Sequence, residues 1–118
     1  MSTSNYRGES PGLLVVARDK IIVGVVLAAY TPSAELGRVM TVNDFFVKPG
    51  NRWKGVGREL AIRLVEECKR VNIDEIGLEV FQNNKTAASS GRSIGFKPTD
   101  RFLFRQKLEQ TTSRNPTL

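Results

Sequence analysis

The 118-residue sequence contains no histidine and only one cysteine, Cys68. Without histidine there can be no Ser-His-Asp triad, no Cys-His dyad and no histidine-ligated metal. A single cysteine excludes an intrachain disulfide and a thiolate metal cluster, and one unpaired thiol fits a reducing cytoplasm. Any proton transfer at a functional site must therefore rely on carboxylates, hydroxyls or water.

Long apolar segments are also missing. The first twelve residues are polar and do not resemble a signal peptide, and the longest apolar run, Ile21–Tyr30, is about half of what a membrane-spanning helix needs. We expect a cytoplasmic protein without a membrane partner. Residues 1–12 and 110–118 are expected to be flexible ends that flank one domain over residues 13–109.

The charge balance is basic, because 18 Lys and Arg outnumber 12 Asp and Glu and leave a net charge of +6. Such a balance indicates an anionic partner, which charge alone leaves open between nucleic acid, a membrane surface and a phosphorylated small molecule. The hydrophobic share of 40% is typical of a globular chain with one core.

The pattern of apolar residues predicts a protein of the α+β class with the order β-β-β-α-β-α-β. Helices are expected over residues 55–71, where an apolar stripe includes Cys68 as a core residue, and over residues 84–94. The first three strands form an antiparallel meander, and the long helix then crosses to a parallel fourth strand. The five expected strands cover residues 13–17, 21–30, 39–47, 76–81 and 101–108.

A basic, glycine-rich loop links the third strand to the long helix. Gly55 and Gly57 have no Cβ, so a phosphate can approach the unpaired N–H groups of the first helical turn. No Gly-Lys-Ser/Thr follows, and the third glycine of a dinucleotide fingerprint is absent. A surface turn with incidental glycines is the alternative interpretation. The cations around this point are Arg52, Lys54 and Arg58.

Two segments resemble motifs of the GNAT superfamily of N-acetyltransferases. Arg52-x-x-Gly55-x-Gly57 is similar to its acyl-CoA pyrophosphate loop, Arg/Gln-x-x-Gly-x-Gly/Ala. A later motif of the family has a strand, an Asn, an Ala three residues on, and Gly-Phe after a helix. The residues at those places are Asn84, Ala87, Gly95 and Phe96. The resemblance covers about residues 13–108.

The resemblance implies acetyl-CoA as co-substrate and no metal. The third and fourth strands would splay to admit the cofactor, and the basic loop would hold its pyrophosphate. Trp53 would either cover the cofactor or pack on the sheet. The implied cofactor-binding residues are Phe45, Phe46, Val47, Arg52, Trp53, Lys54, Gly55, Val56, Gly57, Arg58, Asn84 and Ala87.

Acetyl transfer to an amine also needs a base and an acid. Glu79 is the first candidate base, because burial in the fourth strand would raise the pKa of its carboxyl; a salt bridge is its alternative role. Asp44 is the second candidate, with a solvated or Lys-paired acid facing the acceptor groove as the alternative. Gly91 stands where the family has a Tyr acid, so Ser90 or water would have to protonate the thiolate.

The family usually begins with a strand and two helices that wall the acceptor site, and here only polar residues precede the first expected strand. Either a second subunit covers that surface, which favours a homodimer, or the acceptor groove is open. The expected function is N-acetylation of a small-molecule amine or of a protein N-terminus or lysine, by direct attack in a ternary complex. The alternative is a non-catalytic or weakly catalytic acyl-CoA-binding module. Nucleic-acid binding is disfavoured, because no pattern of aromatic and basic residues suited to base stacking supports it.

Overall fold

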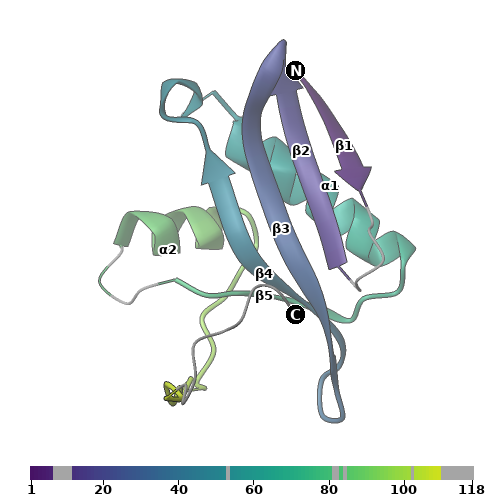
Figure 1. Cartoon of the computed structure of the whole chain (residues 1–118), viewed down its shortest axis with the longest axis vertical. Coiled ribbons are helices and arrows are strands. Elements are labelled where there is room, and N and C mark those ends of the chain that lie inside the picture. The colour runs from purple at the N-terminus through teal and green to yellow at the C-terminus, as the bar shows by residue number, and fades with distance from the viewer. Residues whose placement is uncertain (7–11, 53, 81–82, 84, 102, 110–118) are drawn as a thin grey trace.

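The computed structural model describes residues 1–6, 12–52, 54–80, 83, 85–101 and 103–109. In this part of the chain a single sheet has the strand order β1-β2-β3-β4-β5, with one long helix packed behind it (Figure 1). The elements in chain order are β1 (Ser2–Tyr6), β2 (Gly12–Asp19), β3 (Ile21–Ser33), β4 (Gly37–Val47), the short 3₁₀ helix η1 (Pro49–Asn51), α1 (Val56–Arg70), β5 (Glu75–Leu78) and α2 (Lys85–Ser93).

The first four strands are antiparallel to their neighbours, and β5 lies parallel to β4. The α+β class and the helical crossover between a parallel pair are thus confirmed. The β4–β5 ladder begins at Val39 and Glu75 and ends at Val42 and Leu78. Because β4 continues to Val47, its last five residues have no partner on β5, and the two strands part as expected.

The core lies between the sheet and α1. Leu60 and Leu64 are fully buried on the helix, and Cys68 on the same stripe is 2% exposed, which confirms it as a core residue. Helix α1 approaches β3 at Gly24, where an added Cβ would lie 2.8 Å from Leu60 Cδ1 and 2.9 Å from Val56 Cγ1. The absence of a side chain at Gly24 therefore sets how closely the first turns of α1 sit on the sheet.

The expectation of a loose N-terminal end is wrong for residues 2–6, which form β1 and pair with β2. Residues 2–6 are polar and lack the apolar pattern that predicts a strand. Their backbone groups can pair with β2 regardless of the side chains. Asn5 anchors it further, because its amide donates to the buried Glu67 at 2.8 Å and accepts from Arg63 at 3.1 Å. The strand with which the family usually begins is therefore present as β1. Only five residues, 7–11, separate it from β2.

A β-bulge interrupts β4 in the middle of the sheet. Leu27 pairs with Asp44 while its neighbour Ala28 pairs with Val42, so Asn43 is the extra residue of the bulge and has no pairing partner on β3. A bulge of this kind reverses the face to which every later side chain points.

Strict alternation along residues 39–47 predicts that Asp44 and Phe46 share the face of Met40 and Val42, and the bulge makes this prediction wrong. Phe46 is instead 51% exposed and lies on the face away from α1. The β4 side chains that pack toward the core are Met40, Val42, Phe45 and Val47.

The C-terminal part differs most from expectation. The fourth strand ends at Leu78 rather than at residue 81, and residues 101 and 103–109 form no strand. The alternating pattern alone predicted a strand, but this segment is held by side chains: Arg105 pairs with Glu79 at 2.8 Å, and Arg101 pairs with Glu35. No helix in the described ranges is long and apolar enough to cross a membrane.

Candidate functional site

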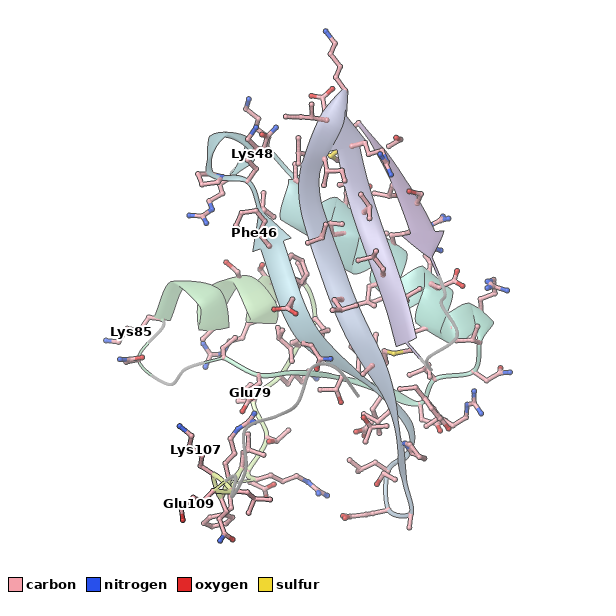
Figure 2. All side chains as sticks on the ribbon, viewed as in Figure 1. Phe46, Lys48, Glu79, Lys85, Lys107 and Glu109 are labelled. Atoms are coloured by element: carbon pink, nitrogen blue, oxygen red, sulfur yellow. The ribbon has the colours of Figure 1, made fainter. Side chains whose placement is uncertain are left out.

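The opening between β4 and β5 is the place where the fold can admit a ligand. It starts just beyond the Val42–Leu78 pair, where β4 continues and the described residues after Leu78 leave the sheet. In Figure 1, α2 lies on the side of β4 opposite to β3, so the opening has β4 on one side and α2 on the other. At the far end of β4, Lys48 begins the glycine-rich loop (Figure 2).

The loop is built to leave the start of α1 open. Lys48 N donates to Val23 O at 2.8 Å, which ties the loop to the sheet, and Arg52 Nε donates to Val47 O at 3.3 Å. Gly55 is the N-cap residue with a φ of 80°, a left-handed conformation that favours glycine, and no side chain caps the helix. The N–H groups of the first turn and the positive end of the helix dipole are thus available to an anion.

The first turn of α1 lies directly against the end of β4. A Cβ at Gly57 would lie 3.7 Å from both Phe45 Cε1 and Val47 Cγ2. The structure therefore brings the predicted pyrophosphate loop next to the predicted cofactor-binding residues of β4. Lys54 and Arg58 are exposed there and have no ion-pair partner among the described residues.

Two predicted cofactor residues, Trp53 and Asn84, lie outside the described residues. Ala87 lies in the first half of α2, as the resemblance implies. Helix α2 itself is confirmed within one residue of its expected bounds.

Glu79 is not buried, so the expectation that the fourth strand encloses this candidate base is wrong. It follows the end of β5, its side chain is 55% exposed, and it accepts a hydrogen bond from Arg105 at 2.8 Å. Figure 2 shows it toward the C-terminal segment that carries Lys107 and Glu109. The strand ends too early to bury this carboxylate, so its alternative role as half of a salt bridge is the one observed.

Asp44 occupies a more open position beside the bulge. It is exposed, lies two residues beyond the last β4–β5 pair, and faces away from α1. In the described part of the chain its carboxylate has neither a hydrogen-bond nor an ion-pair partner, so no lysine neutralises it. A cationic group of a ligand can therefore reach this carboxylate.

Gly91 is buried where α2 meets the end of β5. A Cβ there would lie 3.5 Å from Leu78 Cδ2 and 3.9 Å from Phe96 Cβ, beside a cavity of about 80 Å³. Ser90 is exposed, and its carbonyl accepts a hydrogen bond from Ser93 Oγ at 2.7 Å. A Cβ at this position would therefore make only ordinary contacts, and Gly91 itself has no hydroxyl that could take the role of the expected tyrosine.

The profile of the acetyltransferase (GNAT) family matches residues 2–96. The chain belongs to this family. The match begins within β1 and ends at Phe96, so it includes both motifs and the front strand. No curated protein matches the chain.

Solved structures of GNAT proteins share the fold. An aminoglycoside N-acetyltransferase, AAC(6')-Iy in complex with CoA, superimposes with a TM-score of 0.73 at 20% identity, over 82% of this chain and 76% of its own. A possible acetyltransferase from Clostridium difficile 630 gives a TM-score of 0.76 at 20% identity, over 87% and 70% of the two chains. AAC(6')-IG from Acinetobacter haemolyticus gives 0.73 at 20% identity, over 86% and 74%.

The sequence reasoning missed two features that shape the site. One is the bulge at Asn43, which has no specific signal in the residue pattern because a single Asn within a strand pattern does not by itself mark a bulge. The other is Gly24, for which a signal existed: a glycine within the apolar run Ile21–Tyr30 indicates close backbone approach by another element.

Proposed function

We propose that the protein is an N-acetyltransferase that moves an acetyl group from acetyl-CoA to an amine by direct attack in a ternary complex. The observation that carries the proposal is the glycine-rich start of α1, which has no side-chain cap and lies against the part of β4 that extends beyond β5. The absence of Cβ atoms at Gly55 and Gly57 fits a pyrophosphate on the helix N-terminus. Lys54 and Arg58 would add charge complementarity.

The cofactor would extend from this loop along β4. Lys48 lies five residues after Asn43, which is about 16 Å of strand and comparable to an extended pantetheine arm. Backbone groups of Phe45, Phe46 and Val47 would bind this arm, with Asn84 and Ala87 opposite. The thioester would then lie near the point where β4 and β5 part.

In the transfer step the amine nitrogen attacks the thioester carbon, a C–N bond forms and the C–S bond breaks. A backbone N–H of β4 would stabilise the oxyanion. The amine proton passes to a carboxylate or to water, and the departing thiolate takes a proton from Ser90 or water. Glu79 and Asp44 are the candidate bases; a bell-shaped pH–rate profile altered by Glu79→Gln but not by Asp44→Asn would assign the first.

Calorimetry and thiol release test the proposal together. Acetyl-CoA should bind and protect the protein against thermal unfolding, and an amine panel that includes aminoglycosides should release thiol. Arg58→Gln should weaken CoA binding, whereas Lys69→Gln, a matched change at the other end of α1, should not. Failure to bind CoA at near-millimolar concentration would refute the proposal.

A second candidate is an acyl-CoA-binding module without efficient turnover, and the observation that favours it is Gly91. Because this glycine packs against Leu78 and Phe96, no acid group stands at the tyrosine position. Tight CoA binding with no thiol release from any amine would favour the module.

We also propose a homodimer in the cytoplasm, the compartment indicated by the single buried thiol. The described sheet ends at the short strand β5, and the nearby C-terminal segment exposes three large apolar side chains. A second copy seated along β5 would cover them. Sedimentation at several concentrations should show a dimer that dissociates in the double variant Leu103→Ser, Leu108→Ser.

A further inference from the structure

The face of the sheet away from α1 carries an ordered block of side chains. Two rows run across β2, β3 and β4, and in each row the residues are direct pairing partners. The first row is Leu14, Leu27 and Asp44, and the second is Val16, Val25 and Phe46. We call these six residues the uncovered face.

This surface is apolar and is open on its β4 side, whereas Val16 on β2 is buried at 3% exposure. Leu27 is 42% and Phe46 is 51% exposed, although both are large hydrophobic residues. Adjacent strands lie about 4.8 Å apart and successive residues of one face about 7 Å, so the block measures roughly 10 by 7 Å. That area matches one aromatic or branched aliphatic group rather than a second protein surface.

Asp44 is the only charged member of the block. The next paired row on one side is Gly12, Ala29 and Thr41, which adds no charge. On the other side Arg18 pairs with Ile22, and Lys48 follows the end of β4, so the charges that flank the block are positive. A ligand with several cationic groups would place all but one of them against apolar or basic residues.

Asp44 also marks the reactive end of the opening. It lies two residues beyond Val42, where β4 parts from β5, and its carboxylate accepts no hydrogen bond from the described residues. A group held at Asp44 would therefore be next to the acetyl thioester, if the cofactor binds along β4 as proposed above.

We propose that the acceptor is a primary amine with a single positive charge on an apolar body, which lies on the uncovered face with its nitrogen at Asp44. This inference rests on the proposed acetyl transfer. The carboxylate pairs with the ammonium form, and the neutral amine then forms the C–N bond while the C–S bond breaks. Two protons leave the nitrogen: the first, from the ammonium, passes through Asp44 or water to solvent, and the second, lost as the amide forms, ends on the CoA thiolate. The step therefore balances without a further reactant.

The experiment compares thiol release from phenethylamine, ethanolamine and spermidine. Phenethylamine should have a kcat/KM about tenfold or more above the other two, since burial of its ring on apolar side chains is worth about 2 kcal/mol. Asp44→Asn should raise its KM about fivefold, as expected for a half-exposed ion pair, with CoA binding unchanged. Asp19→Asn, an exposed aspartate at the end of β2, is the matched control and should change neither.

A second pair of variants tests the apolar contact that the acceptor is proposed to make. Leu27→Ser should remove most of the preference for phenethylamine over ethanolamine, whereas Ile21→Ser, an equally exposed apolar change on β3, should preserve it. Amide NMR shifts of the CoA-bound protein during a phenethylamine titration provide a readout that does not need turnover. They should move first in the strands around Leu27 and Asp44.

The outcomes separate the two proposals. If CoA does not bind, the proposed function fails. If CoA binds but spermidine or ethanolamine is the better acceptor, or the amide shifts move elsewhere, the acceptor class is wrong while the acetyl transfer stands. If sedimentation shows a dimer that Leu27→Ser dissociates, a second copy covers this face and the inference is overturned.

Discussion

Replacement of Gly24 by alanine tests how the core positions the glycine-rich loop and the start of α1. The new Cβ would lie 2.8 Å from Leu60 Cδ1, 2.9 Å from Val56 Cγ1 and 3.2 Å from the carbonyl oxygen of Phe46. Both side chains are buried at 3% exposure or less, and the carbonyl belongs to β4, so none of the three can give way freely. The first turns of α1 must therefore shift outward from the sheet.

The expected cost is about 1–3 kcal/mol for overpacking, offset by about 0.4–1 kcal/mol from the reduced freedom of the unfolded chain. A net loss of about 1–2 kcal/mol should lower the Tm by about 5 °C or more. Because Val56 begins the helix whose N–H groups would bind pyrophosphate, CoA affinity should fall several-fold as well. Differential scanning calorimetry and CoA titration measure the two effects.

Gly77→Ala provides the matched control, because it is also a glycine within a strand, and its Cβ would meet only Thr41 Oγ1 at 3.9 Å. It should leave the Tm unchanged or slightly higher and CoA affinity unchanged. The reasoning is refuted if Gly24→Ala is as stable as Gly77→Ala. A lower Tm for Gly24→Ala without any change in its CoA affinity would refute only the link between the core and the loop.

Three further changes test other parts of the structure. Asn5→Ala should lower the free energy of unfolding by about 1–2 kcal/mol, because Glu67 loses a buried donor, and Thr3→Ala, measured by the same urea titration, should cost less. Burial, and to a lesser extent Glu67, raises the pKa of the Cys68 thiol from 9.0 to about 11, so the folded state holds this proton more tightly than the unfolded state. The resulting stability is present below pH 9 and lost as the pH rises toward 11, a loss that thermal melts should show and that Cys68→Ala should abolish. Gly91→Ala should be tolerated, whereas Gly91→Tyr should lower the Tm, since a cavity of about 80 Å³ does not hold a phenol ring; equal melting temperatures would contradict this packing.

Much of the fold was predictable because its signals are local. The apolar stripe of α1 has a helical period that no strand can satisfy, and it placed Cys68 in the core correctly. The loop with Gly55 and Gly57 was also readable, since glycine spacing next to a helix start has few uses. These residues act through their own backbone and their own helix.

Glu79 and residues 101–108 show where local reasoning stopped. Their alternating patterns are typical of strands, but strand formation depends on a partner with the right register and length. Strand β5 ends after four residues, so Glu79 reaches solvent and Arg105 rather than the core. Strand β1 shows the converse, because a polar segment becomes a strand once β2 and Glu67 provide its partners.

By itself, then, the sequence determined the proposed cofactor side of this protein: the helix start, its glycines and its cations are contiguous, and their chemistry depends little on distant residues. Only the tertiary structure decided the proposed acceptor side. The bulge at Asn43 turns Asp44 and Phe46 away from α1 and places them beside Leu27. Cross-strand pairing joins residues that are far apart in the chain, and a one-residue slip changes the face they share, so no local pattern could have specified this surface.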